Sequence, residues 1–150
     1  MPLPSGLPEQ VGDAEPISRF LTSKNHFNSK AVKQAAFLPN RKNGRLSVAR
    51  HDGEPVEESA RIAREDFQLE NVFGTAVLEA KAFREENLDF EADDTPVRHA
   101  DVVGWPWLED DPEFGKSEQK LKAAALAQKA NEMKTRIIYS ESGWTSDFAK

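Results

Sequence analysis

The sequence predicts an α+β fold, with one small, mostly antiparallel sheet of about four to six short strands and two or three helices packed on one face. Several short segments carry apolar residues at alternating positions, which is typical of strands, and longer stretches carry them at helical spacing. Strands and helices do not alternate regularly along the chain, which argues against a doubly wound parallel sheet. The length of 150 residues fits one domain.

Four short segments are predicted as strands because they alternate or are rich in β-branched and aromatic side chains. They cover residues 17–21, 46–48, 88–92 and 97–105. A short apolar run at residues 35–38 fits either a strand or a turn of helix. Residues that favour turns predict chain reversals at 40–44 and 93–96.

Three segments are predicted as helices. Residues 55–68 begin with a proline suited to the first helical position, and they form one apolar stripe of Val56, Ala60, Ala63 and Phe67. Residues 76–86 are mostly strong helix formers. Residues 117–134 begin at a serine that can cap a helix, and a narrow stripe continues beyond them, comprising Ala123, Leu126, Ala130, Met133 and Ile137.

The two ends of the chain differ in composition from the middle. Residues 1–16 contain four prolines and two glycines without apolar periodicity, which predicts a disordered N-terminal lead. Residues 17–138 are predicted to form the single α+β domain. Residues 139–150 lack periodic apolar residues and are predicted to form a flexible C-terminal tail.

Charge is distributed unevenly along a chain whose net charge is −6. Residues 17–50 contain eight Lys or Arg and no Asp or Glu, whereas residues 51–114 contain nineteen acidic and five basic residues. Oppositely charged segments that meet in the fold, or face solvent separately, are the simpler interpretation. A basic face for an anion is the alternative.

Several classes of protein are disfavoured by what the sequence lacks. There is no cysteine, which favours a reducing compartment and excludes thiolate chemistry. The N-terminus does not resemble a signal peptide, and no stretch approaches the length of a membrane span, so we expect a cytoplasmic protein. Phosphate-binding glycine loops, paired metal-binding histidines and nucleophile elbows are missing, so we expect no cofactor and no metal.

The segment from Arg98 to Pro106 is the most distinctive in the chain. On a strand, His99 and Asp101 point to the same face, because side chains alternate with a period of two. An imidazole and a carboxylate on one face could act as a general base with its orienting partner, or as two ligands of a metal. The alternative, which we favour, is a histidine that ties the strand to a loop by hydrogen bonds.

Arg19 and His26 are further candidates. Arg19 interrupts an apolar strand and needs a countercharge, which would be either an internal carboxylate such as Asp101 or an anionic ligand. His26 lies in a polar loop, where functional residues are often placed. The catalytic candidates are therefore His99, Asp101 and His26, and the candidate substrate-binding residues are Arg19, Arg50, Arg98 and Trp105.

Four segments of the chain resemble a group of short bacterial proteins. They are Arg19-Phe20, His26-Phe27, Leu46-Ser47-Val48 and the run from His99 to Pro106. The resemblance spans roughly residues 17 to 130. It implies a bacterial, cytosolic protein and carries no implication for fold or activity.

The sequence leaves three functional hypotheses open, and it does not decide whether the protein is an enzyme. The first is a non-enzymatic domain that binds a protein partner through its acidic middle and charged helices. The second is a small enzyme or binding protein for a nucleotide or phosphate, with Arg19, His26, Arg50, His99 and Asp101 in one pocket. The third is nucleic-acid binding by the basic segment at 17–50, with Trp105 or Trp107 stacking, which the overall acidity disfavours.

Overall fold

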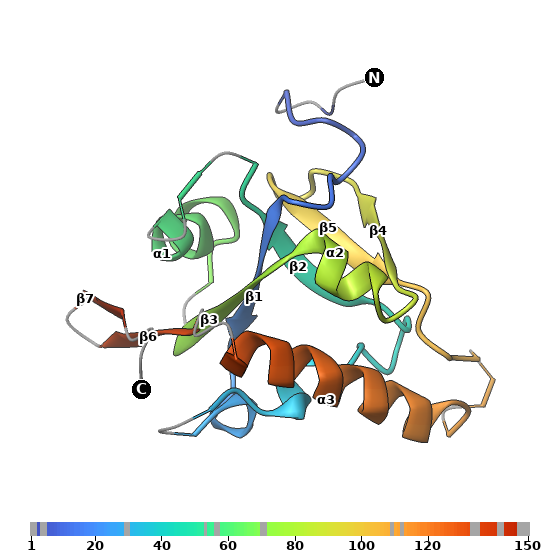
Figure 1. The fold of residues 1–150 in the computed structure, drawn as a ribbon. Helices are drawn as coiled ribbons and strands as arrows, with labels where there is room; N and C mark the ends of the chain where they lie inside the picture. The colour runs from blue at the N-terminus through green and yellow to red at the C-terminus, as the bar shows by residue number, and fades with distance from the viewer. Residues whose placement is uncertain are drawn as a thin grey trace.

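A seven-stranded sheet organises the computed structural model, with the strand order β4-β5-β2-β1-β3-β6-β7 (Figure 1). All six pairs of neighbouring strands are antiparallel. The structure describes residues 3, 6–28, 31–52, 54–55, 58–69, 72–108, 110–111, 113–132, 136–140 and 143–146. The strands are β1 Pro16–Leu21, β2 Leu46–Arg50, β3 Gly74–Glu79, β4 Asp89–Ala92, β5 His99–Val103, β6 Arg136–Ser140 and β7 Gly143–Ser146.

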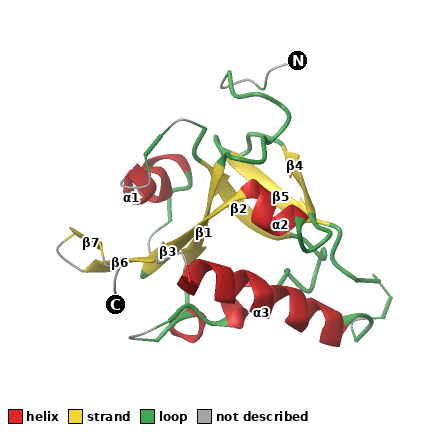
Figure 2. Ribbon diagram, in the orientation of Figure 1, coloured by secondary structure: helices red, strands yellow, loops and turns green. Residues whose placement is uncertain are grey.

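Helices cover both faces of the sheet (Figure 2). One face carries α2 (Ala80–Arg84), α3 (Lys116–Glu132) and the 3-10 turn η2 (Gln34–Phe37), whose apolar side chains share one core. The other face carries α1 (Ser59–Arg61), which continues into the π-helical turn η4 (Ile62–Asp66). The predicted α+β class and antiparallel sheet, with two helices on one face, are confirmed.

Alternation along β1 shows how the strands separate two apolar cores. Ile17 and Leu21 are fully buried in the larger core, beneath α2, α3 and η2. Phe20 points the other way and packs with Ile62 and Ala63 in the smaller core. Because β1 is central and covered on both sides, a side chain on either of its faces is removed from bulk water.

The predicted helix at 76–86 is wrong in its first half. Residues Gly74–Glu79 form β3, a strand inside the sheet, and only Ala80–Arg84 are helical. Ala76, Val77 and Leu78 are at most 4% exposed, so both faces of β3 are buried. A strand covered on both faces shows no alternation of apolar and polar residues, and its alanine and leucine therefore suggested a helix.

The other predicted elements agree with the structure to within a few residues. Strands β1, β2, β4 and β5 occupy the four predicted segments, and residues 35–38 fall largely in the η2 turn. Helix α3 covers the predicted range as far as residue 132, and residues 133 and 134 lie outside the described residues. Of the helix predicted at 55–68, the structure shows residues 59–66 as helical, whereas residues 56 and 57 lie outside the described residues.

The ends of the chain differ from their predictions. Residues 6–16 pack against the domain: Leu7 and Val11 are buried, and the Ala80 N–H donates to the Glu15 carbonyl oxygen. The predicted disordered lead therefore does not describe these residues, because apolar contacts without a helical or strand period also bury a chain. Residues 136–140 and 143–146, which fall at the predicted end of the domain and in the predicted tail, pair as β6 and β7. Residues 1, 2, 4, 5, 141, 142 and 147–150 lie outside the described residues.

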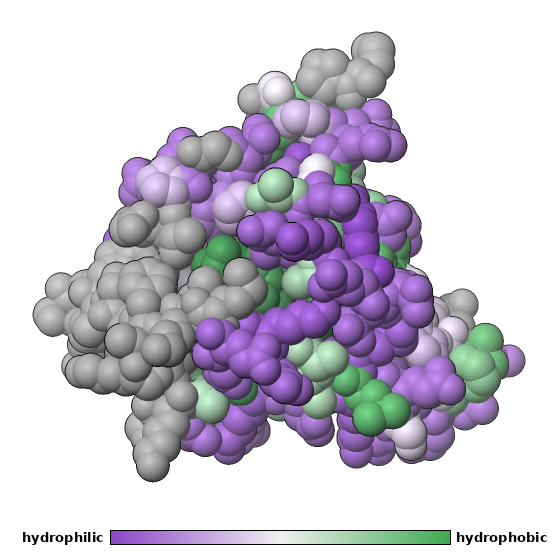
Figure 3. Space-filling view, viewed as in Figure 1, coloured by the Kyte–Doolittle hydropathy of each residue, from purple (hydrophilic) through white to green (hydrophobic). Residues whose placement is uncertain are grey.

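The visible surface is mostly polar (Figure 3). Large apolar side chains that reach solvent include Val97, Leu108, Phe114 and Leu121, of which Leu121 is 72% exposed. Within the part of the chain that the structure describes, no helix has both the length and the apolar character needed to cross a membrane.

Candidate functional site

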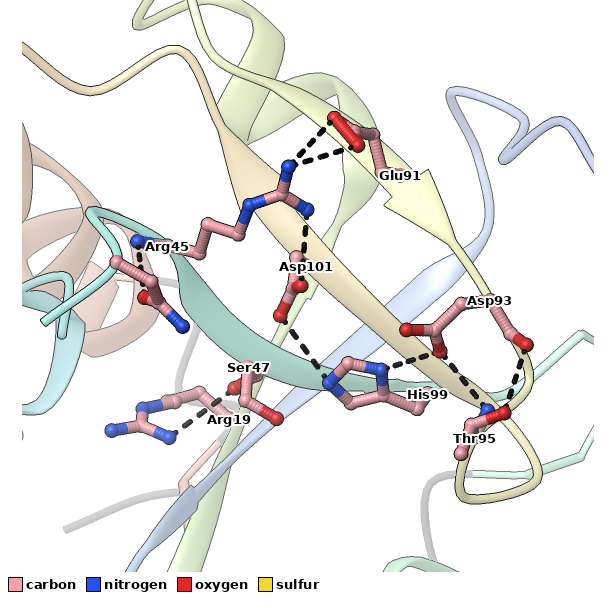
Figure 4. Close-up of polar contacts among 9 residues, drawn as sticks. Arg19, Arg45, Ser47, Glu91, Asp93, Thr95, His99 and Asp101 are labelled. Carbon is pink, nitrogen blue, oxygen red and sulfur yellow. Dashed lines mark hydrogen bonds and ion pairs between the residues drawn. The ribbon is translucent and has the colours of Figure 1, made fainter.

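His99 and Asp101 point to the same face of β5, as the sequence predicts, while Ala100 and Val102 are fully buried on the other. Asp101 Oδ1 lies 3.3 Å from His99 Nε2 (Figure 4). The other ring nitrogen, Nδ1, lies 2.7 Å from Oδ1 of Asp93 in the turn between β4 and β5. Both ring nitrogens of His99 therefore face carboxylates.

This arrangement limits what His99 can do chemically. Carboxylate oxygens engage both ring nitrogens, whereas a general base needs one nitrogen lone pair directed at a substrate. The centroid of the Phe67 ring lies 6.1 Å from the centroid of the imidazole, and the two ring planes are tilted by 52°. Phe67 therefore covers the imidazole on the side of the sheet that carries α1. The geometry favours the histidine as a tie between strand and turn over the catalytic role.

Arg45 completes the network around Asp101. Its Nη1 lies 3.3 Å from Asp101 Oδ2, and its Nη2 lies 3.2 Å from Glu91 Oε1 (Figure 4). Glu91 and Asp101 are directly opposite each other in the β4–β5 register, where like charges repel. The Arg45 guanidinium joins the two carboxylates and so offsets that repulsion, and its hydrogen bond to Asp101, more than the charge of Glu91, raises the pKa of Arg45.

Asp94 and Arg98 stabilise the turn that precedes β5. Asp94 is buried, and its Oδ1 accepts a hydrogen bond of 3.0 Å from the Arg98 N–H. The Arg98 side chain donates to the carbonyl oxygens of Arg50 and His51, and it forms ion pairs with Glu54 and Asp66. These contacts occupy the donors of Arg98, so the predicted substrate-binding role has no support in this geometry.

Arg50 is likewise committed to the fold. It is fully buried, and its Nε and Nη2 lie 3.0 and 2.9 Å from the two carboxylate oxygens of Glu15. Its Nη1 donates to the Pro8 carbonyl oxygen at 2.6 Å. The guanidinium holds the N-terminal segment against the sheet rather than facing a ligand.

Arg19 and His26 are brought near each other but away from His99. Ser18 is paired with Ala49, and Ala49 is paired with His99, so these three side chains lie on one face of the sheet. Arg19 follows Ser18 in β1 and therefore lies on the opposite face, with Ile17 and Leu21. Its Nε donates to the Ala36 carbonyl oxygen at 2.6 Å and its Nη1 to the Ser47 carbonyl oxygen at 3.2 Å. Asp101 is therefore not its countercharge, and the candidate residues do not converge on one pocket.

A buried cluster around His51 was not identified from the sequence. Ser18 Oγ lies 2.6 Å from His51 Nε2, and Ser59 Oγ lies 3.4 Å from the same nitrogen. All three residues are fully buried, and burial lowers the pKa of His51. A substrate cannot reach a serine with no exposed surface, so we interpret the cluster as a polar tie between β1, β2 and α1. The alternation of Ser18 with apolar β1 residues was the only available signal.

Trp105 and Trp107, which flank Pro106, have different surroundings. Trp105 is 6% exposed and belongs to that core, and its Nε1 has no hydrogen-bond partner among the described residues. Trp107 packs on Gly44, where an added Cβ would lie 2.6 Å from the indole Cδ2. The burial of Trp105 leaves no ring face for stacking a substrate or a base.

An acidic cleft lies along the outer edge of β4. It has a volume of about 1070 Å³ and separates β4 from residues 6–11 of the N-terminal segment. Its acidic lining residues are Glu9, Asp89 and Glu91, and Arg84 is its cationic one. Arg84 is already engaged, because Nη1 lies 2.6 Å from Asp13 Oδ1 and Nε lies 3.1 Å from Asp89 Oδ1.

Backbone groups of β4 face this cleft because β4 has a neighbour on one side only. The Asp93 N–H donates toward β5, to the His99 carbonyl oxygen at 3.4 Å. Alternation along the strand then directs the backbone groups of Phe90 and Ala92 outward. The Phe90 N–H donates a hydrogen bond of 2.9 Å to Asp89 Oδ1, whereas the described residues provide no partner for the Ala92 N–H.

Comparison of the chain with protein-family models, with curated protein sequences and with solved structures gives no match. Among the described residues, no group of three or more His, Asp or Glu side chains is arranged to hold a metal ion. The functional argument therefore depends on the geometry alone.

Proposed function

We propose that this protein is a non-enzymatic interaction domain that binds an extended, basic segment of a partner protein along β4. The open backbone edge of β4 inside an acidic cleft is the observation that carries the proposal. An exposed strand edge accepts an added strand through main-chain hydrogen bonds, and the side chains beside it supply selectivity.

The carboxylates beside β4 determine which kind of partner segment can bind there. Glu91 is 55% exposed and lies on the face of the sheet that also carries Asp101 and Asp93, so a strand next to β4 would place every second side chain near carboxylates. Lysine or arginine at those positions would form cross-strand pairs of opposite charge. Acidic segments would be repelled, and complementary charge also accelerates association.

The enzymatic and nucleic-acid hypotheses receive less support from the same geometry. Arg19 and His99 point to opposite faces of the sheet, and both nitrogens of His99 are engaged. Within the basic segment, Arg45 and Arg50 are paired with carboxylates of other segments. The basic stretch is thus partly neutralised and does not present one continuous surface to a polyanion. We further propose a bacterial cytosolic location, supported by the absence of cysteine and by the resemblance described above.

A binding titration tests the proposal with a short peptide of alternating valine and lysine, labelled for fluorescence anisotropy. We expect saturable binding that weakens several-fold between about 50 and 200 mM salt, because part of the attraction is between exposed charges. A peptide of alternating valine and glutamate should not bind. Equal binding of both peptides, or of neither, would contradict the proposal.

Two variants locate the binding at β4. Ala92→Pro removes an outward N–H without removing a bond to β5, since proline is tolerated on a strand edge, and it should weaken binding roughly fivefold or more. Glu91→Gln should weaken binding of the lysine peptide and reduce its salt dependence. Glu118→Gln, at the exposed start of α3, is the matched charge control and should bind like the parent.

A further inference from the structure

Arg19, His26 and Lys33 of the basic segment lie along a continuous series of hydrogen bonds. Arg19 Nε donates to the carbonyl oxygen of Ala36 at 2.6 Å, and the Ala36 N–H donates to the carbonyl oxygen of Lys33 at 3.1 Å. The Lys33 N–H in turn donates to the carbonyl oxygen of His26 at 2.8 Å. These bonds bring the Arg19 side chain and the backbones of His26 and Lys33 to one corner of the molecule, between β1, the 3-10 turn η1 (Lys24–His26) and η2. The antiparallel bridge between Phe27 and Val32 places His26 opposite Lys33.

Each of these residues keeps a hydrogen-bond donor available. Arg19 uses Nε and Nη1 for carbonyl oxygens, and its Nη2 has no partner among the described residues. The Nδ1 of His26 accepts from the Thr22 N–H at 3.2 Å, so a neutral ring carries its proton on Nε2, which also lacks a partner in the described part of the chain. Lys33 is exposed, and the described carboxylates include none paired with it.

Among the described residues, no carboxylate forms an ion pair with these three residues, although Glu132 lines the same surface pocket as Lys33. Residues 17–50 contain no Asp or Glu, and the described residues show no ion pair for Arg19, although Arg45 and Arg50 of the same segment have theirs. Loss of hydration lowers the pKa of Arg19 to about 10, so it stays charged at neutral pH. Burial, with a smaller contribution from the Arg19 charge, lowers the pKa of His26. A half-buried cation without a carboxylate favours binding of an anion.

We propose that Arg19, His26 and Lys33 form a binding site for a small oxyanion of the phosphate class. A tetrahedral oxyanion can accept charge-assisted hydrogen bonds from a guanidinium, an imidazole N–H and an ammonium group at once. The site is independent of the β4 edge, because it uses other residues and a ligand of the opposite charge. Loss of one activity by mutation should leave the other intact.

The test is an NMR titration of the full chain with inorganic phosphate at constant ionic strength, following the ring signals of all three histidines. We expect the His26 signals to shift saturably, with a dissociation constant in the millimolar range, and the pH midpoint of His26 to rise in phosphate. The signals of fully buried His51, and of His99 on the other face, should stay in place.

Variants separate a specific site from general attraction. Arg19→Gln should weaken phosphate binding about tenfold, the loss of a charge-assisted hydrogen bond. Lys33→Gln, at an exposed position that the fold does not depend on, should weaken it roughly two- to fivefold. Arg41→Gln removes an exposed charge of the same segment and should have no effect. Unsaturable shifts, or equal binding by Lys33→Gln and the parent, would overturn the proposal.

Discussion

Asp101 occupies the centre of the charged network on the outer half of the sheet. Its side chain is 18% exposed and contacts both His99 and Arg45. Without the Asp101 carboxylate, the His99 ring contacts only Asp93, and Arg45 pairs only with Glu91. Asp101→Ala should therefore lower the free energy of unfolding by about 2 kcal/mol, the range for hydrogen bonds to charged groups.

Denaturant melts check this effect against a matched carboxylate. Asp110 is exposed, and none of the described residues forms an ion pair with it, so Asp110→Ala should change stability by less than about 0.5 kcal/mol. The neighbouring turn residue Asp94 is no such control, because it is buried and caps the Arg98 N–H. An Asp101 variant as stable as the parent would remove the structural role that we assign to Asp101.

His51 gives the fold a dependence on pH. Burial lowers the folded-state pKa of His51 below its unfolded value of about 6.5, so the unfolded state binds the proton more readily. Stability is thus complete above about pH 6.5 and falls as the pH decreases toward the folded pKa. The half-buried His26 adds in the same direction.

Urea melts between about pH 7.5 and 5.5 measure this dependence. The parent should lose stability toward the acidic end, and His51→Gln, although less stable overall, should show a shallower slope. His26→Gln serves as the comparison and should reduce the slope less, because His26 is less buried. A slope that His51→Gln leaves unchanged would mean that His51 does not titrate on unfolding.

At the scale of the element, the turn before β2 depends on Gly44. Its φ of +67° lies in the left-handed region, and a Cβ there would lie 2.6 Å from the Trp107 ring. Gly44→Ala combines backbone strain with a steric clash and should cost about 2 kcal/mol. Gly12→Ala is the control, because nothing lies within 4 Å of its Cβ position. Thermal melts of the two variants should differ clearly, and equal melting would show that Trp107 moves aside freely.

Individual elements differ in how well the sequence predicts them. Strand β5 has one polar and one buried face, so its alternation locates it and places His99 and Asp101 together. Strand β3 is buried on both faces and lacks that alternation, so its composition wrongly predicted a helix. The partners of Asp101 could not be found in the same way, because Arg45 and Glu91 reach it only through the register of three strands.

At the scale of the whole molecule, the uneven charge is explained in part by segments that meet. Arg45 from the basic stretch pairs with Asp101 and Glu91 of the acidic stretch, and Arg50 pairs with Glu15. The acidic stretch has a large excess of carboxylates, and part of that excess lines the β4 cleft. The part of the basic stretch that remains unpaired includes Arg19, at the corner with His26 and Lys33.

Amide hydrogen exchange of Ala92 tests the central claim most directly. The outward N–H of Ala92 has no partner among the described residues, so it should exchange rapidly in the free protein. Saturation with the valine–lysine peptide should slow its exchange at least tenfold and shift the amide signals of residues 89–92, while those of α3 stay unchanged. Peptide binding that leaves the exchange of Ala92 as fast as before would contradict strand addition at β4.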